Sequence, residues 1–175
     1  MTGNPCALVG TGGHAKVVVE VLRKLHREIA FATTNDPVPP DAEFLGIPVR
    51  GTDIYLDGQD RDGLDLAIGV GAPDSGITRR RISEHFGEIG FRVATLVHPS
   101  ATVATDVELG AGAQIMAGAI VQPGSRIGNG AIVNTGARVD HDCDIGAFAH
   151  VAPGVTICGS VRIGANSLLG AGATL

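Results

Sequence analysis

Several residue types are scarce or absent in this chain of 175 residues. It has no tryptophan, one tyrosine and five phenylalanines. Lysine occurs only at Lys16 and Lys24, and the formal net charge is −5. We therefore expect no nucleic-acid partner, because neutralising phosphates requires a basic stripe on the protein surface.

Long hydrophobic runs and patterned cysteines are also missing. No stretch of about 18 apolar residues occurs, so no transmembrane helix is expected. The opening stretch, MTGNPCALVG, shows neither a charged n-region nor a cleavage site, so no secretory signal is expected. Cys6, Cys143 and Cys158 lack metal or redox spacing and are typical of reduced, packed residues. These features predict a cytoplasmic protein without a membrane partner or a metal site.

The chain does have an aliphatic residue at every sixth position from Val97 onward. These positions are Val97, Val103, Leu109, Ile115, Val121, Ile127, Val133, Val139, Ile145, Val151, Ile157, Ile163, Leu169 and Leu175. Four residues after each of them, except the last, stands a small or β-branched residue. These are Ala101, Val107, Ala113, Ala119, Ser125, Ala131, Ala137, Cys143, Ala149, Val155, Val161, Ser167 and Ala173. A period held without a slip indicates a repeat architecture.

A period of six suits a coil whose corners return every six residues. Three flat sides make a turn of about 18 residues, and successive turns stack at roughly 4.8 Å, the spacing of strands. The aliphatic position would point into this prism, whose narrow interior agrees with Phe148 being the single aromatic residue of the repeat. Glycines after the aliphatic position, such as Gly110 and Gly128, are expected to supply unusual backbone angles at corners. The pattern predicts an all-β parallel β-helix over residues 96–175.

Residues 1–95 alternate between strand and helix patterns. Strands are expected at 6–10, 29–33, 44–51 and 65–71, and helices within 11–28 and at 76–88. The helices follow from apolar residues at helical spacing, and the strands from short apolar runs bounded by glycine, proline or polar residues. This alternation predicts a small α/β domain with a parallel sheet.

A glycine-rich turn, GTGGHAK, joins the first strand to the first helix and fits the pattern G-x-G-x-x-A. Glycines let backbone N–H groups approach a phosphate, and a helix N-terminus favours an anion. The alternative is a tight turn that only packs helix on strand, and His14 suits a ligand contact or a polar helix start equally. The candidate binding residues here are Gly10, Gly12, Gly13, His14 and Lys16.

A dinucleotide enzyme would also need an acid about 20 residues after the glycine turn. Asp36, which follows Thr33 and Thr34, is the candidate for this acid. The domain is short for a full dinucleotide fold, so a mononucleotide or a nucleotide sugar is a better fit than NAD.

The sharpest chemical signal in the repeat is the segment VDHDCD at residues 139–144. Val139 and Cys143 occupy inward phases, so His141 should face outward between carboxylates. Such an imidazole can be oriented and kept basic, and a placed general base contributes typically 10²–10⁴-fold. The alternative is a solvated surface histidine. His150 lies half a turn further on, so the two histidines should meet only between subunits.

Taken together, four segments resemble those of a known family. They are the G-T-G-G-H-A-K turn, V-H-P-S-A before the hexads, N-T-G-A-R-V-D-H-D and A-H-V-A-P-G-V. The whole chain resembles the sugar O-/N-acyltransferases of the sialic acid O-acetyltransferase and bacillosamine N-acetyltransferase type. The resemblance implies a small Rossmann-like domain followed by a left-handed β-helix. It also implies a homotrimer with acetyl-CoA between neighbouring prisms and a nucleotide-linked amino sugar as acceptor.

The resemblance also implies roles for particular residues. His141 would remove a proton from the attacking sugar amine or hydroxyl, and Asp142, where the family often has Glu, would orient it. Asn134 and His150 match positions at the substrate and the acetyl group. Gly159 matches a glycine whose backbone N–H can face the thioester oxygen.

The glycine turn from Gly10 to His14 matches the phosphate site of the nucleotide sugar. Relatives that bind a uridine nucleotide often carry two aspartates after the second strand, where this chain has Thr33 and Thr34. Relatives also continue beyond the position of Leu175 with further hexads and a short tail that helps to hold CoA. The coil is therefore expected to lack its C-terminal turns. The resemblance does not decide which nucleotide the chain binds.

The predicted reaction is direct acetyl transfer without a covalent enzyme intermediate. Cys143 points inward and suits a nucleophile poorly, whereas Cys158 is expected at a corner, where a nucleophile could lie. A γ-carbonic-anhydrase-like zinc hydratase shares the fold but needs about three converging histidines, and the repeat holds only His98, His141 and His150, none closely spaced. A non-enzymatic trimeric binding or assembly module is the other alternative.

Overall fold

The computed structural model describes residues 3–71 and 76–175, which divide into two compact units. The α/β unit comprises Met1–Gly71 with Ile82–Ala94, and the coil unit comprises Ala72–Arg81 with Thr95–Leu175. Residues 1–2 and 72–75, which fall in the expected domain 1–95, lie outside the described residues. None of the described helices is both long enough and apolar enough to span a bilayer.

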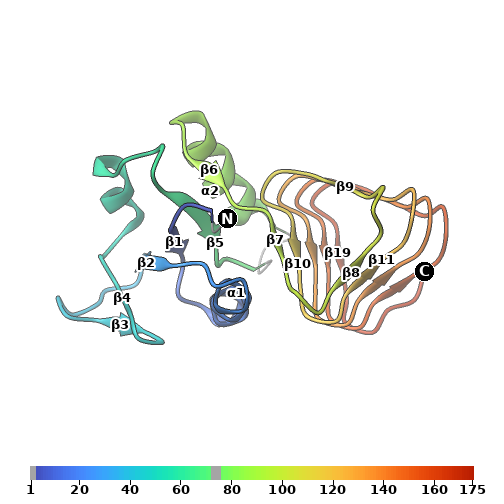
Figure 1. Ribbon diagram of the computed structural model, residues 1–175, viewed down its shortest axis with the longest axis horizontal. Helices are drawn as coiled ribbons and strands as arrows, with labels where there is room; N and C mark the ends of the chain where they lie inside the picture. The colour runs from blue at the N-terminus through green and yellow to red at the C-terminus, as the bar shows by residue number, and fades with distance from the viewer. Residues whose placement is uncertain (1–2, 72–75) are drawn as a thin grey trace. The chain divides into compact units, whose positions relative to one another are not determined.

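The α/β unit is built on a parallel four-stranded sheet in the order β2-β1-β5-β6 (Figure 1). Its strands are β1 (Cys6–Val9), β2 (Ile29–Thr33), β5 (Asp65–Ile68) and β6 (Arg92–Val93). Every residue of β1 is buried, because β1 lies between β2 and β5 in the sheet. The predicted parallel α/β architecture is confirmed.

The described residues form two α-helices, α1 (Gly13–Lys24) in the α/β unit and α2 (Ile77–Glu88), of which the residues from Ile82 onward belong to that unit. Helix α1 buries Ala15, Val18, Val19, Val21 and Leu22. These positions repeat every three to four residues, so the apolar face forms one stripe along the helix. Both helices fall where the sequence pattern predicts them.

The segment between β2 and β5 differs from the expectation. The single strand expected at 44–51 is a hairpin of β3 (Glu43–Phe44) and β4 (Ile47–Pro48), which turns through Leu45 and Gly46 with φ of 55° and 79°. Positive φ at both central residues is typical of a two-residue hairpin turn. A 3-10 helix, η1 (Asp53–Gly58), follows and was not predicted, because six residues are too few to show a helical period.

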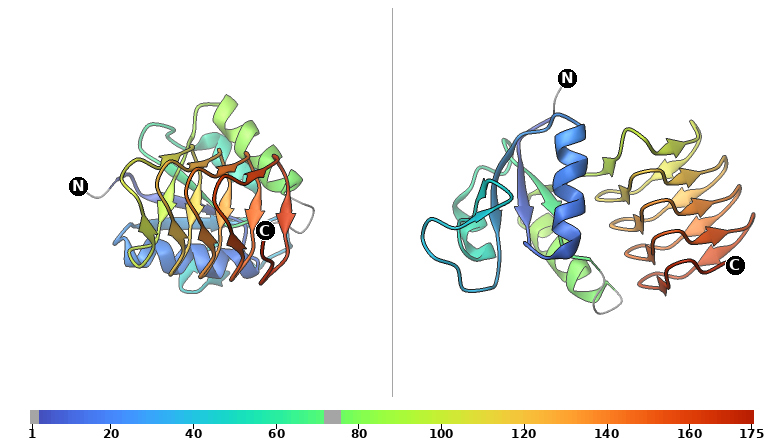
Figure 2. Two further views of the ribbon diagram at one scale, coloured as in Figure 1. Left: turned by 90° about the vertical axis from the view of Figure 1, so that its right-hand side faces the viewer. Right: turned by 90° about the horizontal axis from the view of Figure 1, so that it is seen from below.

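The coil unit is a left-handed parallel β-helix with three sides (Figures 1 and 2). The β7 side consists of β7 (Leu96–Val97), β10 (Gln114–Ile115), β13 (Ile132–Val133), β16 (His150–Val151) and β19 (Leu168–Leu169). The β8 side consists of β8 (Thr102–Val103), β11 (Ile120–Val121), β14 (Arg138–Val139) and β17 (Thr156–Ile157). The β9 side consists of β9 (Glu108–Leu109), β12 (Arg126–Ile127), β15 (Asp144–Ile145) and β18 (Arg162–Ile163).

Each strand pairs in register with the strand one full turn later, so equivalent residues of successive turns stack. The aliphatic positions from Ile115 to Ile157 are buried in the interior, whereas the last of the series, Leu175, is 42% exposed. The small residues four positions later pack with them in the same core cluster, as Ala131 and Ala137 do. The period of six therefore encodes both the core and the stacking.

The glycines that directly follow the aliphatic positions do not supply the unusual backbone angles expected of them. Positive φ occurs two residues later, at positions such as Gly130 (φ 60°) and Asp142 (φ 57°), and not at Gly110 or Gly128. A Cβ on Gly128 would lie 2.5 Å from the backbone nitrogen of Ala147 in the next turn. These glycines are required because stacked turns approach closely, not because the backbone bends there.

Candidate functional sites

His141 lies on the corner of the coil that follows β14, with its side chain 58% exposed. Its imidazole packs against Gly159, which stacks on it one turn later. A Cβ on Gly159 would lie 2.6 Å from Nε2 of His141, so only glycine leaves room for the ring. The His141 carbonyl accepts a hydrogen bond of 2.8 Å from the Ser160 N–H, and the His141 N–H donates to Oδ1 of Asp140 at 2.8 Å. The ring is therefore held in place although it is exposed.

Two carboxylates set the protonation behaviour of this imidazole. Nδ1 of His141 lies 2.8 Å from Oδ2 of Asp142, and this hydrogen bond raises the pKa of His141 above its ordinary value of 6.5. The negative charge of Asp140 acts in the same direction. In the neutral ring Nδ1–H donates to Asp142, so the lone pair is on Nε2. Nε2 has no hydrogen-bond partner among the described residues and can accept a proton from outside.

Asp142 owes its position to a left-handed backbone conformation, with φ of 57°. Aspartate tolerates this conformation better than most residues. Its N–H donates to the Pro123 carbonyl of the preceding turn at 3.0 Å. A side chain at Gly124 would collide with the Asp142 carboxylate. The corner thus aims the carboxylate at His141 through backbone geometry.

Asn134 and His150 form a second polar pair, on the β7 side. Ile132 and His150 stand in register, and Nδ2 of Asn134 lies 3.0 Å from Nε2 of His150. Oδ1 of Asn134 accepts the Thr135 N–H at 2.8 Å, which fixes the orientation of the amide. Nδ2 therefore donates, and Nε2 of His150 accepts as the unprotonated nitrogen of a neutral ring. The structure brings these two residues together, but they lie on a different part of the coil from His141.

Gly159 has a backbone N–H that donates to no group among the described residues. A cleft of about 210 Å³ opens on the β8 side next to the His141 corner. Its lining residues are Ile120, Gln122, Arg138, Val139, Asp140, Thr156, Ile157 and Cys158. Asp140 and Cys158 are the chain neighbours of His141 and Gly159, so this cleft borders the corner that carries the imidazole and the free N–H.

The two cysteines of the coil differ in their access to this site. Cys143 is buried, and its thiol donates to the Cys158 carbonyl at 3.2 Å. Burial raises the pKa of the Cys143 thiol, which disfavours the thiolate that a nucleophile needs. Cys158 is exposed beside the cleft.

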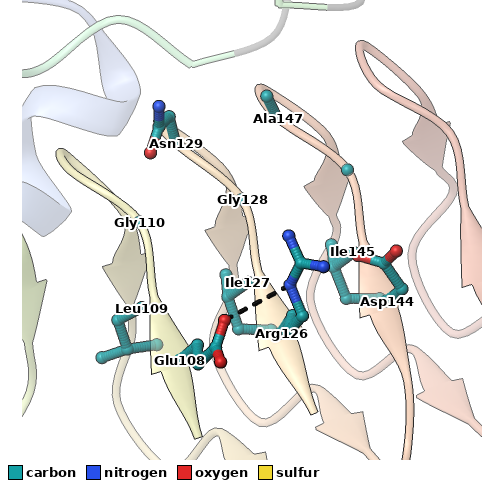
Figure 3. Close-up of a pocket in the computed structure, with 11 residues that line it drawn as sticks. Glu108, Leu109, Gly110, Arg126, Ile127, Gly128, Asn129, Asp144, Ile145 and Ala147 are labelled. Atoms are coloured by element: carbon teal, nitrogen blue, oxygen red, sulfur yellow. Dashed lines mark ion pairs between the residues drawn. The ribbon is translucent and has the colours of Figure 1, made fainter.

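A larger cleft of about 360 Å³ lies on the β9 side (Figure 3). Glu108, Arg126 and Asp144 stand in register along it, and Nε of Arg126 lies 3.4 Å from Oε2 of Glu108. Gly110, Gly128 and Gly146, which follow the strands β9, β12 and β15, also line the cleft. This cleft is lined by no histidine or cysteine, so it offers no base or nucleophile of the kind found at His141.

The glycine turn of the α/β unit follows β1. Gly10 has φ of 94° and a Cβ there would lie 3.0 Å from Val70, so both conformation and space demand glycine. Gly12 and Gly13 instead face open space, with no atom within 4 Å of a Cβ at either position. Gly12 caps α1 without any side-chain hydrogen bond, and the first turn of α1 holds no acid. The exposed N–H groups and the positive end of the helix therefore suit an anion.

The other residues expected at this turn lie at varied depth. His14 is partly buried next to Gly71, and a Cβ on Gly71 would lie 3.3 Å from Cβ of His14. Lys16 is exposed in the first turn of α1.

Thr33 and Thr34, which follow one another at the end of β2, are both buried. Oγ1 of Thr33 donates to Oδ1 of Asp53 at 2.6 Å. Asp36, the acid expected here, is exposed and contacts Thr34 through its backbone N–H at 3.3 Å. The carboxylate at the end of β2 thus comes from η1. No sequence pattern pointed to Asp53, because only the tertiary fold brings it to β2.

The remaining candidates are accounted for as follows. Nδ1 of His98 accepts the Ser100 N–H at 3.0 Å, so this ring caps the turn that enters the coil. Within the described ranges 3–71 and 76–175, no group of three or more His, Cys, Asp or Glu side chains is arranged to hold a metal ion.

Comparisons with known proteins cover both units. Residues 6–86 match the PglD N-terminal domain, and residues 106–141 match the bacterial transferase hexapeptide (six repeats). The chain is similar to the acetyltransferase domain of PglB from Neisseria gonorrhoeae FA1090, solved in complex with acetyl coenzyme A. The identity is 38%, the TM-score is 0.89, and the match covers 98% of this chain and 82% of that one.

Two further solved structures are similar. PerB from Caulobacter crescentus, in complex with CoA and GDP-perosamine, is 36% identical with a TM-score of 0.81, over 98% of this chain and 88% of that one. WeeI from Acinetobacter baumannii AYE is 14% identical with a TM-score of 0.65, over 97% of this chain and 93% of that one, and shares the fold.

Proposed function

Because this chain belongs to the hexapeptide-repeat sugar acyltransferases of the sialic acid O-acetyltransferase and bacillosamine N-acetyltransferase type, we propose that it acetylates a nucleotide-linked amino sugar. Acetyl-CoA is the acetyl donor, and an amine or hydroxyl of the sugar is the acceptor. The proposal is supported by the complexes of its relatives, one with acetyl coenzyme A and another with CoA and GDP-perosamine.

The observation that carries this proposal is the oriented imidazole of His141 with its outward Nε2. Nε2 accepts the proton of the acceptor amine or hydroxyl while that group attacks the thioester carbonyl. The hydrogen bond from Nδ1 to Asp142 and the nearby charge of Asp140 stabilise the imidazolium that forms. The carbon–sulfur bond then breaks, and the imidazolium returns the proton to the departing CoA sulfur.

Gly159 supplies the group that stabilises the reacting carbonyl. Its backbone N–H is unpaired among the described residues, and the residue itself packs against the His141 ring. Donation of this N–H to the carbonyl oxygen would stabilise the negative charge that develops there. Because the thioester must contact both groups, the cleft bordered by Asp140 and Cys158 is the path by which the acetyl group enters.

Asn134 and His150 take part from a neighbouring subunit. They lie half a turn of the coil away from His141, so one chain does not present all of these groups to one substrate. A homotrimer would bring the β7 side of one coil toward the His141 corner of the next. In this arrangement the hydrogen-bonded Asn134–His150 pair contacts the substrate and the acetyl group. Sedimentation equilibrium tests the trimer, and cell fractionation tests the predicted cytoplasmic location.

The α/β unit binds the nucleotide part of the acceptor. Its glycine turn offers N–H groups and open space at Gly12 and Gly13, as a phosphate requires. Gly10 and His14 flank that space in the sequence, and Lys16 in the first turn of α1 adds a positive charge.

The test is acetyl transfer to a panel of UDP- and GDP-linked amino sugars, followed by release of the CoA thiol and by product mass. We expect turnover by the unaltered chain and a loss of at least ~10²-fold in His141→Ala, the cost of removing a general base. His98→Ala, which removes a histidine that only caps a turn, is the matched control and should stay active. Transfer by His141→Ala within about threefold of the unaltered chain would contradict the base assignment. Binding of nucleotide sugars without any CoA release would instead indicate a binding module.

A further inference from the structure

The carboxyl ends of β1 and β2 form an edge of the sheet where a buried hydroxyl and a carboxylate are coupled. The Gly10 N–H, at the start of the glycine turn, donates to the Thr33 carbonyl at 2.9 Å. Oγ1 of the same Thr33 donates to Oδ1 of Asp53 at 2.6 Å. Two hydrogen bonds thus connect the proposed phosphate turn to the Asp53 carboxylate through one residue.

This coupling orients Asp53 toward an external donor. Thr33 has no exposed surface, so its hydroxyl is fixed, whereas Asp53 at the start of η1 is partly exposed. Oδ1 is engaged by Thr33, and Oδ2 has no partner among the described residues. An ionised carboxylate only accepts hydrogen bonds. The free oxygen therefore suits a ligand group that donates, and it repels the phosphates that the glycine turn would bind.

Resting on the proposed nucleotide-sugar function, we propose that Asp53 binds the ribose hydroxyls of the nucleotide and makes this chain select ribonucleotides over 2′-deoxyribonucleotides. In a nucleoside diphosphate the ribose is attached directly to the phosphates. The free oxygen Oδ2 stands beside the phosphate turn, and its two lone pairs match the donors of the 2′- and 3′-hydroxyls. In dinucleotide-binding folds an acid associated with the second strand takes the same role. Here η1 supplies the acid, because the strand itself ends in Thr33.

A neighbouring cleft leaves room for the base. A cleft of about 270 Å³ is lined by Val38, Pro39, Pro40, Val49, Arg50 and Gly51. The Thr34 N–H donates to the Gly51 carbonyl at 2.8 Å, so the cleft adjoins the end of β2. Its proline and valine side chains suit the flat face of a base, which places ribose rather than base at Asp53.

The experiment compares dissociation constants for GDP and 2′-deoxy-GDP, and for UDP and 2′-deoxy-UDP, by isothermal titration calorimetry. We expect the unaltered chain to prefer each ribonucleotide by about tenfold, the value of a hydrogen bond to a charged group. Asp53→Ala should lose that preference by weakening ribonucleotide binding alone. Thr33→Val, which keeps the buried shape and removes the hydroxyl, should reduce the preference in part. Asp57→Ala, another exposed acid of η1, is the matched control and should retain it.

Several results would overturn the inference. One is an unchanged preference for ribonucleotides in Asp53→Ala. A second is an equal loss of affinity for the ribonucleotide and the 2′-deoxyribonucleotide in that variant. A third is a changed preference between GDP and UDP, which would indicate that Asp53 contacts the base. Thermal unfolding of the unliganded variants checks that they are folded. If the unaltered chain binds none of the four nucleotides, the inference is wrong. The proposed function is tested separately by acetyl transfer to nucleotide-linked sugars, and it is wrong as well if that transfer is also absent.

Discussion

The coil and the α/β unit assemble their candidate sites in opposite ways. In the coil, Val139 pairs in register with Ile157, so the residues that follow them, His141 and Gly159, stack by repetition. In the α/β unit, Thr33 meets Asp53 across a hairpin and a loop that follow no period. A repeat converts sequence spacing directly into contact, whereas an ordinary domain brings side chains together through its whole tertiary fold.

Glycine shows the same contrast. In the coil, Gly128 is required because the next turn occupies the space of a Cβ. In the α/β unit, Gly13 faces open space, so nothing in the folded chain demands glycine there. We infer that the first kind of glycine serves stability and the second kind serves binding. Three substitutions separate these roles.

The largest effect is expected from Gly128→Ala in the coil. A Cβ there would lie 2.5 Å from the nitrogen and 2.8 Å from Cα of Ala147, and backbone atoms cannot rotate away as a side chain does. We expect the free energy of unfolding to fall by about 3 kcal/mol, the upper range for overpacked sites. Urea unfolding followed by circular dichroism measures this change. Unaltered stability would show that the turns are not closely stacked.

A smaller and different effect is expected from Gly13→Ala in the glycine turn. The Cβ of a helical residue points toward the helix N-terminus, where the phosphate is proposed to bind. Affinity for GDP or UDP should fall by about tenfold, because the side chain blocks approach to the backbone. Stability should not decrease, since alanine suits a helix and meets no atom within 4 Å. Calorimetric titration and thermal unfolding measure the two quantities, and a loss of stability with unchanged affinity would reverse the assignment.

The smallest effect is expected from Gly87→Ala near the end of α2. The φ of this glycine is not positive, and no atom lies within 4 Å of the place that a Cβ would occupy, so alanine fits without strain. Replacing glycine in a helix should raise the free energy of unfolding by about 0.5 kcal/mol. The variant is also the control for Gly128→Ala, since both make the same chemical change. Equal destabilisation by the two substitutions would mean that close stacking of the turns does not make glycine necessary at Gly128.

Much of the fold could be predicted because it rests on local patterns. The hexads specify the interior residues of the coil up to Leu169, and β2 spans the predicted 29–33 because its apolar run ends at polar Thr34 and Asn35. The 3-10 helix η1 and the hairpin of β3 and β4 are too short to show a period. Their positions depend on what they pack against, which no local pattern reports.

The candidate sites also differ in whether a local sequence pattern could predict them. The exposure of His141 follows from its phase in the hexad, and the hydrogen bond to Asp142 joins chain neighbours. Asp53 could not be found this way, because it reaches Thr33 through tertiary structure. The glycines after the aliphatic positions were misjudged for a further reason. A glycine in the sequence indicates that a side chain is not tolerated at that position. It does not tell whether a positive φ or the close approach of a neighbouring backbone is the reason.

The most direct test of the account is the pH dependence of kcat/KM for acetyl transfer in the unaltered chain and in Asp142→Asn. A general base must be unprotonated, so the rate should fall as pH drops through the pKa of His141. The hydrogen bond to Asp142 raises that pKa above 6.5, so the fall should begin above this pH in the unaltered chain. In Asp142→Asn it should shift to lower pH with a reduced plateau, while Asp144→Asn, which alters an exposed carboxylate of the β9 side, should keep the original profile. Superimposable profiles for the unaltered chain and Asp142→Asn would contradict the account.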